Sequence, residues 1–242
     1  MNAPTNAVTT PVIATRALQS GYGDAMVLKG IDLALAPGEV LAILGKNGMG
    51  KSTLLKTLMG YIRPAEGEIA LFGEPAAGLP PNRIARREVA YIPQEKALFQ
   101  DLSVEENLKL ALRRDRDFRP MFARIEDLFP FLKERLKQKA GTLSGGEQKM
   151  LLVARALIRR PKLILVDEIT EGMQPSVIER LGGILRRERD ESGTAMLLVE
   201  QHVPFAFSVA SRYAVMELGE IPASGETSEA LASATVSRYL SL

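Results

Sequence analysis

The 242-residue chain contains no cysteine and only one histidine. The lack of cysteine excludes disulfide bonds and thiolate metal sites, and it is compatible with a reducing cytosol. A single histidine also excludes a metal site built from a cluster of histidines. Metal chemistry that depends on groups of cysteine or histidine is therefore ruled out.

The sequence pattern predicts neither a membrane-spanning segment nor a signal peptide. No stretch approaches the ~20 apolar residues that cross a bilayer, and the start, MNAPTNAVTTP, has neither a basic nor an apolar region. We expect residues 1–10 to be disordered, because they are rich in threonine, asparagine and proline. If this protein works at a membrane, a partner must recruit it.

An excess of charge of one sign is missing as well. The 31 Lys and Arg residues nearly balance 29 Asp and Glu residues, so the net charge is +2 and no nucleic-acid-binding surface is indicated. Hydrophobic residues make up 46% of the chain, which is typical of an ordinary globular protein. The length suits one domain, with or without a small inserted lobe.

Short apolar runs alternate with helical patterns along the chain. Residues 12–18 and 30–35 alternate with a period of two and predict half-buried strands, whereas residues 40–44 are continuously apolar, as in a strand buried on both faces. Further apolar runs end at Pro93, Asp167 and Glu200. This order predicts an α/β fold with a mostly parallel sheet, whose chemistry lies beyond the carboxyl ends of the strands.

Between about Glu95 and Thr142 the pattern is helical, with charged faces and no run that is typical of a buried strand. We interpret this segment as an inserted helical lobe. Arginines and aspartates alternate over residues 113–119, which indicates a solvated helix face.

Residues 45–52 read GKNGMGKS and fit the phosphate-binding pattern G-x-x-x-x-G-K-[ST]. Glycines let the backbone turn tightly with its N–H groups facing an anion, and the following helix presents its positive end to the same anion. Lys51 would place its charge on the β- and γ-phosphates, and Ser52 would offer a hydroxyl to Mg²⁺. Because the match follows a buried strand and opens a helix, we favour a nucleotide site over a chance glycine-rich turn.

Two acids, Asp167 and Glu168, follow the apolar run 163–166. An acid at a strand end beside a phosphate loop is well placed to hold Mg²⁺, directly or through water, and a second acid can polarise the attacking water. Many strands end in an acid, so this signal depends on the phosphate loop for its meaning.

Residues 143–148 read LSGGEQ and predict a second helix N-terminus that can receive an anion. Ser144 and Glu147 form a capping-box pattern, and an apolar helix is expected from Lys149 to Arg160. Since the chain already has one phosphate site, the second must face another nucleotide. With this motif the chain resembles the ABC ATPase family, whose signature reads LSGGQ, over nearly its whole length.

The resemblance implies an ABC-type P-loop NTPase that binds ATP and Mg²⁺ and hydrolyses ATP. Its α/β fold would have a mostly parallel core sheet, an N-terminal antiparallel β part and a helical subdomain at about 95–142, within a domain covering 11–242. Nucleotide contacts are implied for Tyr22, Gly45, Asn47, Gly48, Gly50, Lys51, Ser52, Thr53, Ser144, Gly145 and Gly146. Catalytic roles are implied for Glu168, His202 and Gln94, and metal contacts for Ser52, Gln94 and Asp167.

Three of these residues take their roles from the resemblance. Tyr22 occupies the place of the aromatic residue that stacks on adenine, although a tyrosine alone is more often a core or surface residue. Gln94 resembles the glutamine that touches Mg²⁺ and senses the membrane subunits. His202 resembles the switch histidine that contacts the γ-phosphate.

The chain departs from the family after Glu168. Ile169 stands where the family usually has proline, and residues 171–174, EGMQ, lack the usual aspartate of this loop. We expect Gln174 to replace that aspartate in hydrogen bonds between subunits; the alternative is that Gln174 only starts the loop before Pro175.

Residues 170–175, TEGMQP, and 212–217, RYAVME, resemble the shorter ATPase of importers for branched-chain amino acids, urea and short-chain amides. The resemblance implies a second ABC ATPase in a homo- or heterodimer, two transmembrane permease subunits and, indirectly, a periplasmic solute-binding protein. It implies no nucleic acid, and it places the chain peripherally on the cytoplasmic face of the cell membrane. The ATPase does not touch the solute, so the sequence does not identify it.

Other kinds of ABC ATPase have features that this sequence does not contain. DNA-repair members carry a long coiled coil between the phosphate loop and the signature, and ribosome-associated members carry two cassettes. A module without catalysis is disfavoured because Lys51, Glu168 and His202 are present. Exporter motors are often fused to membrane spans, and an exporter motor or a soluble non-transport ATPase stays as the alternative.

Overall fold

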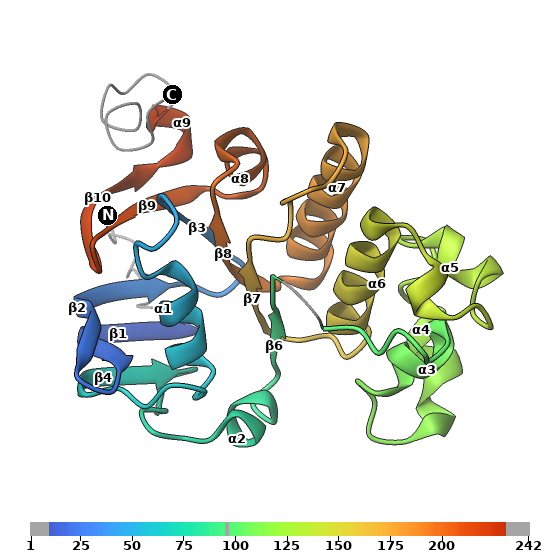
Figure 1. Cartoon of the computed structure of the whole chain (residues 1–242), viewed down its shortest axis with the longest axis horizontal. Coiled ribbons are helices and arrows are strands. Elements are labelled where there is room, and N and C mark those ends of the chain that lie inside the picture. The colour runs from blue at the N-terminus through green and yellow to red at the C-terminus, as the bar shows by residue number, and fades with distance from the viewer. Residues whose placement is uncertain (1–9, 95–96, 231–242) are drawn as a thin grey trace, which may run out of the picture.

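The computed structural model describes residues 10–94 and 97–230. The disorder expected for residues 1–10 therefore lies, except for Thr10, outside the described residues. The described chain is built around two β-sheets with helices between and beside them (Figure 1).

The smaller sheet is antiparallel and uses the N-terminal part of the chain. Its strand order is β2-β1-β4-β5. The burial of alternate side chains in β1 and β2 confirms the half-buried strands expected from the period of two, although both strands are longer than predicted. The bounds are β1 Ile13–Tyr22, β2 Ala25–Leu35, β4 Glu66–Leu71 and β5 Glu74–Pro75.

The larger sheet has the order β10-β9-β3-β8-β7-β6, and only the edge pair β10–β9 is antiparallel among its described pairs. The expectation of a mostly parallel sheet is confirmed. The bounds are β3 Val40–Leu44, β6 Val89–Ile92, β7 Leu163–Asp167, β8 Ala195–Glu200, β9 Arg212–Glu217 and β10 Glu220–Glu226.

Helices cover both faces of the larger sheet. Helix α1 lies toward the antiparallel sheet, while α6, α7 and α8 lie on the other side (Figure 1). The bounds are α1 Lys51–Leu58, α2 Pro81–Ala85, α3 Val104–Lys109, η1 Asp115–Asp117, α4 Phe118–Phe122, α5 Pro130–Glu134, η2 Ala140–Thr142, α6 Gly145–Leu157, α7 Pro175–Ser192, α8 Val203–Val209 and α9 Thr227–Ala230.

Two hydrophobic cores follow from the alternation of side chains along the buried strands. In β3, Val40, Ala42 and Leu44 belong to the core shared with α6, α7 and α8. Leu41 and Ile43 point the other way, into the core shared with α1 and the antiparallel sheet. A strand buried on both faces needs apolar residues throughout, which explains the continuous run in the sequence.

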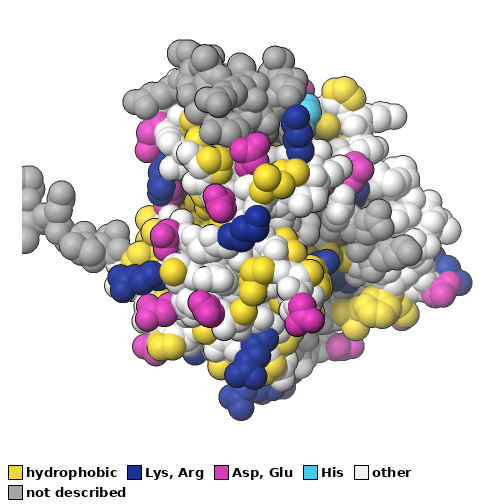
Figure 2. Space-filling view, turned by 60° about the vertical axis from the view of Figure 1, so that its left-hand side comes forward, with side chains coloured by type: hydrophobic (Ala, Val, Ile, Leu, Met, Phe, Trp, Pro, Cys, Tyr) yellow, Lys and Arg dark blue, Asp and Glu magenta, His cyan; other side chains and the backbone are white. Residues whose placement is uncertain are grey.

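The segment expected to form a helical lobe contains α3, η1, α4, α5 and η2 in its described part, and these lie to one side of the sheets (Figure 1). Residues 113–116 are exposed, as the charge pattern predicted, but they form a 3₁₀ turn and its approach rather than a regular helix. On the face shown in Figure 2, lysine and arginine side chains are interspersed with aspartate and glutamate. No helix within residues 10–94 and 97–230 has the length and apolarity needed to cross a bilayer.

The strand order brings four loops together. Strands β3, β8, β7 and β6 are consecutive neighbours and run parallel, so their carboxyl ends meet at one edge of the sheet. The phosphate loop follows β3, Asp167 ends β7 and Glu168 follows it, Gln94 follows β6, and Gln201 and His202 follow β8. Residues that are far apart in the sequence are thereby placed side by side.

Candidate active site

The loop from Gly45 to Gly50 depends on glycine at two positions. A Cβ atom on Gly45 would lie 2.4 Å from the carbonyl oxygen of Met216, and Gly50 enters α1 with a φ of 106°, in the region that favours glycine. The loop therefore turns directly into α1. The first-turn N–H groups of this helix have no partner within it and face the loop as anion donors.

The side chain of Lys51 is buried inside this loop. Its Nζ atom donates hydrogen bonds to the carbonyl oxygens of Gly45, at 2.8 Å, and Lys46, at 2.9 Å. It also forms an ion pair with Oε1 of Glu168 at 2.9 Å. The ammonium group thus connects the phosphate loop to the end of β7.

Asp167 is held by two hydroxyl groups. Ser52 donates to Oδ1 at 2.9 Å, and Tyr91 donates to Oδ2 at 3.1 Å. Burial raises the pKa of the Asp167 carboxyl above its ordinary value, although both hydrogen bonds act in the opposite direction. Burial and the neighbouring Asp167 likewise raise the pKa of the Tyr91 hydroxyl, so Tyr91 stays a donor.

Glu168 is contacted from the ends of two other strands. Its Oε2 atom accepts hydrogen bonds from the side-chain amides of Gln94, at 3.2 Å, and Gln201, at 2.9 Å. The Gln201 amide also lies 2.7 Å from Oδ1 of Asn47 in the phosphate loop. Glu168 has a φ of 42°, which is uncommon for a residue other than glycine and is often found at functional sites.

The second helix N-terminus is formed as predicted. The hydroxyl of Ser144 accepts from the N–H of Glu147 at 3.4 Å, and the Glu147 carboxylate accepts from the N–H of Ser144 at 3.0 Å. The hydrogen bond from the Ser144 N–H, together with one from the Ser144 hydroxyl and the nearby Arg135, lowers the pKa of the Glu147 carboxyl. The helix, α6, runs from Gly145 to Leu157 and ends earlier than expected, because the chain leaves helical geometry before Pro161.

This arrangement agrees with the comparison with known protein families. The family model described as "ABC transporter" matches residues 28–171, which span the phosphate loop, the signature and the β7 acids. The chain belongs to the ABC transporter family.

Several curated ABC proteins are similar to this chain. The high-affinity branched-chain amino acid transport ATP-binding protein BraG of Pseudomonas aeruginosa is 41% identical over 83% of this chain and 86% of its own length. The probable branched-chain amino acid transport ATP-binding protein LivF of Archaeoglobus fulgidus is 35% identical over 91% and 94%. A Nod factor export ATP-binding protein of a Rhizobium species is 35% identical over 86% of this chain and 68% of its own length.

Solved ABC cassettes have the same fold. An ATP-binding cassette of an ABC transporter in its ADP conformation has a TM-score of 0.82 at 24% identity, covering 96% of this chain and 98% of that one. The cbiO1 protein of Clostridium perfringens has a TM-score of 0.82 at 25% identity, covering 95% and 94%. These structures confirm the expected fold. The expected ATPase activity is confirmed by the match to the ABC transporter family and by the ATP-binding relatives.

The predicted site residues of the ABC ATPase are not all brought together. Lys51, Ser52, Asp167, Glu168, Gln94 and Asn47 are connected by the hydrogen bonds and the ion pair above. Tyr22, at the end of β1, exposes 53% of its surface, so its ring is open to a ligand. Thr53 is buried in α1, and His202 is exposed where α8 begins.

Sequence reasoning missed Gln201 and Tyr91 as residues of the site. Both could have been found from the rule that polar groups at strand ends gather in a parallel sheet, since Gln201 directly follows β8 and Tyr91 is the penultimate residue of β6.

The loop after Glu168 is fixed although it lacks the usual family residues. Glu200, which is 1% exposed, accepts hydrogen bonds from the N–H and the hydroxyl of Thr170, at 3.2 and 2.8 Å. Lys149 of α6 donates to the carbonyl oxygens of Ile169 and Glu171. The loop is therefore tied both to β8 and to the helix that carries the signature.

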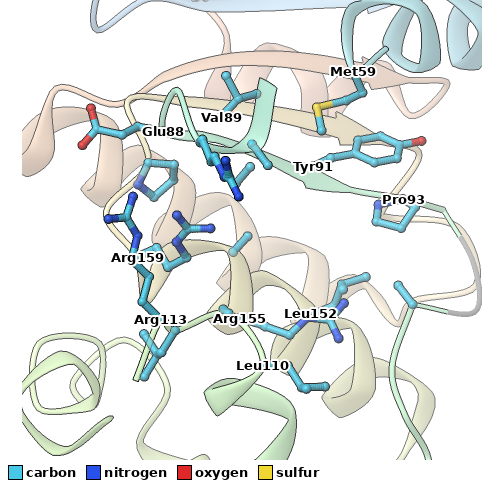
Figure 3. A pocket seen from close by; sticks show the side chains of 18 of the residues that line it. Met59, Glu88, Val89, Tyr91, Pro93, Leu110, Arg113, Leu152, Arg155 and Arg159 are labelled. Carbon is cyan, nitrogen blue, oxygen red and sulfur yellow. The ribbon is translucent and has the colours of Figure 1, made fainter. Parts of the chain in front are cut away.

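A groove of about 1110 Å³ lies between the β6 edge of the sheet and the helical lobe (Figure 3). Apolar side chains, including Val89, Leu110 and Leu152, line it, and arginines project into the same space. Burial lowers the pKa of the Arg155 guanidinium, which indicates that its charge is poorly solvated. The groove includes Tyr91 and Pro93, so it reaches the residues beside Gln94.

Proposed function

We propose that this ABC ATPase hydrolyses ATP to drive the uptake of a small polar solute, in the class of branched-chain amino acids, urea and short-chain amides. The observation that carries the proposal is the cluster of Lys51, Asp167 and Glu168 at the mouth of the phosphate loop. The importer class is supported by the names of the two relatives that match this chain over most of their own length. The export relative matches over a smaller share of its length, so export stays the weaker alternative.

The residues of the site suit the in-line attack of water on the γ-phosphate. On nucleotide binding, the Lys51 ammonium would exchange Glu168 for phosphate oxygens, which frees the carboxylate. Glu168 would then accept a proton from the attacking water while the bond to ADP breaks. Gln94, already bonded to Glu168, would keep the carboxylate directed toward the water.

The donor set beside the loop also fits Mg²⁺. This ion prefers hard oxygen ligands, keeps several waters and is commonly held by one or two protein groups plus phosphate oxygens. Ser52 and Asp167 supply a hydroxyl and a carboxylate 2.9 Å apart, and Gln94 is the third expected contact. When bound, the ion would neutralise charge on the β- and γ-phosphates.

Two further partners are proposed from the remaining features. The helix N-terminus at Ser144, Gly145 and Gly146 would cover the nucleotide of a second ABC ATPase, in a homo- or heterodimer. The groove of Figure 3 would receive a cytoplasmic segment of a permease subunit, with an acid facing Arg155 and Arg159. The groove reaches the neighbours of Gln94, and Gln94 is bonded to Glu168. A permease segment that binds in the groove can therefore influence Glu168.

This proposal places the chain peripherally on the cytoplasmic face of the cell membrane, with two permease subunits and, indirectly, a periplasmic binding protein. We propose residues 11–242 as one ATP-binding domain, with the helical subdomain at about 95–142. The test is to purify the tagged full chain from membranes of its source, identify the proteins that remain bound, and measure uptake in proteoliposomes. We expect permeases and inward, ATP-dependent transport; outward transport or a chain without membrane partners would refute the importer function.

A further inference from the structure

The turn after β8 carries two neighbouring polar residues with different contacts. Gln201 points into the site, where its Nε2 atom lies 2.9 Å from Oε2 of Glu168 and 2.7 Å from Oδ1 of Asn47. Both residues are exposed, but in the part of the chain that the structure describes the His202 side chain makes no hydrogen bond, and only its backbone carbonyl accepts the N–H of Ala206 as α8 begins. Of these two side chains, only that of Gln201 is bonded to the phosphate loop and to Glu168.

We propose that Gln201, rather than His202, is the residue of this turn that contacts the terminal phosphate and positions Glu168. This inference rests on the proposed function, because it assumes that ATP occupies the loop around Lys51. It assigns the phosphate-sensing role to a neutral amide that the family resemblance did not indicate.

The position of the Gln201 amide supports this role. Its two present partners, Asn47 and Glu168, lie on the phosphate loop and at the acid that would activate water, so the amide already spans the space where the γ-phosphate must lie. A side-chain amide has two N–H donors, so it can hold Glu168 with one and give the other to a phosphate oxygen. Asn47 would be released in this exchange.

The neighbouring residue fixes the direction of Gln201. Glu200 is the last residue of β8, and its buried carboxylate is bonded to Thr170 of the loop after Glu168. Successive side chains of a strand point to opposite sides, so anchoring Glu200 toward Thr170 constrains the turn that follows. Pro204, in the first turn of α8, limits the backbone on the other side of His202.

The first test measures nucleotide affinity without turnover. The full chain and the variants Gln201→Ala, Gln201→Met and His202→Ala are titrated with AMP-PNP and with ADP in the presence of Mg²⁺ by calorimetry. Gln138→Ala, which removes an amide bonded to Thr142 in the helical lobe, serves as the control. ADP affinity also reports whether each variant is folded.

We expect both Gln201 variants to weaken the binding of AMP-PNP about 10- to 150-fold while ADP affinity stays within twofold, which corresponds to one hydrogen bond from the amide to the charged γ-phosphate. Methionine preserves the length of the side chain, so a space-filling role would leave Gln201→Met like the unchanged chain. A larger loss of AMP-PNP affinity in His202→Ala than in the Gln201 variants would overturn the proposal.

The second test uses the assembled transporter and separates kcat from KM. If Gln201 positions Glu168, Gln201→Met lowers kcat for ATP at least as much as it raises KM, because the carboxylate loses a donor that holds it. An effect on KM alone would reject the positioning role. If the unchanged chain hydrolyses no ATP in any assembly, the proposed function itself fails, which is a different outcome from an active chain that is insensitive to Gln201.

Discussion

Lys51 and Glu168 form an ion pair of 2.9 Å whose two side chains are almost completely buried, with 3% and 6% of their surfaces exposed. In this arrangement the ammonium group that would bind phosphate is paired with the carboxylate that would activate water. Removing one partner of a buried pair is costly, because the other charge remains without compensation. An incoming phosphate can replace Glu168 as the partner of Lys51, and this couples nucleotide binding to the release of the base.

Replacement of Lys51 by alanine should abolish ATP turnover and greatly weaken nucleotide binding. The variant loses a charge-assisted contact to phosphate, worth roughly 1.5–3 kcal/mol for each such bond, and leaves Glu168 facing the nucleotide with its charge unpaired. Binding of ATP by calorimetry and kcat/KM in the assembled transporter measure the effect. An unchanged kcat/KM would contradict the assignment of the phosphate loop.

Glu168→Gln should keep ATP binding and stall hydrolysis. The amide has nearly the same shape but cannot accept the proton of the attacking water, a function that contributes about 10²–10⁴-fold to rate. Stalled ATP should hold two cassettes together, so a dimer should accumulate with MgATP and the cognate partner ATPase in size-exclusion chromatography. Hydrolysis at the rate of the unchanged chain would show that Glu168 is not the base.

Gln174→Ala should lower turnover in the assembled transporter without changing the ATP affinity of the isolated chain. Gln174 is exposed and precedes α7, where its side chain does not cap the helix, so it is available to another subunit. One neutral hydrogen bond between subunits is worth about 0.5–1.5 kcal/mol, which limits the effect to roughly tenfold. Ser176→Ala, in the same exposed turn, is the control, and full transport-coupled activity of Gln174→Ala would leave the proposed role without support.

Glu188→Gln should stabilise the protein at neutral pH. Burial raises the pKa of the Glu188 carboxyl, with smaller opposing contributions from Thr194, Ser192 and Arg160. The Thr194 hydroxyl lies 2.8 Å from Glu188 and 3.1 Å from the carbonyl oxygen of Pro161, and its single proton can serve only one of these acceptors. A protonated Glu188, or a glutamine amide, can donate to Thr194 and satisfy all three groups.

The raised pKa of the Glu188 carboxyl makes its contribution to stability depend on pH. Because the folded state binds the proton of Glu188 more tightly than the unfolded state, its contribution to stability is complete below the unfolded pKa and is lost as pH rises through the folded pKa. We expect Glu188→Gln to raise the free energy of unfolding, measured in urea, by on the order of 1 kcal/mol at pH 7.5 and by less at pH 4.5, because of the improved hydrogen bonding. An equal or larger gain at pH 4.5 would show that the carboxyl is charged at both values.

Much of the fold could be predicted because each buried strand has its own local pattern. The runs 40–44 and 163–166 are apolar throughout, and both strands proved to be buried on both faces. The helix start at Ser144 was equally predictable, since a capping box involves residues only three positions apart. Helix ends were less accurate, as α6 shows, because a downstream proline limits how far a helix can run but does not fix its last turn.

The sequence by itself determined that the phosphate loop, the two acids and the signature are present, because glycine positions, strand ends and caps are local and each motif is contiguous. Only the tertiary structure decided which side chains meet. It paired Lys51 with Glu168 and brought Gln201 within hydrogen-bond distance of Asn47 and Glu168. The physical reason is that neighbouring residues in a turn point in different directions, and their directions are set by contacts with distant residues, here Glu200 with Thr170.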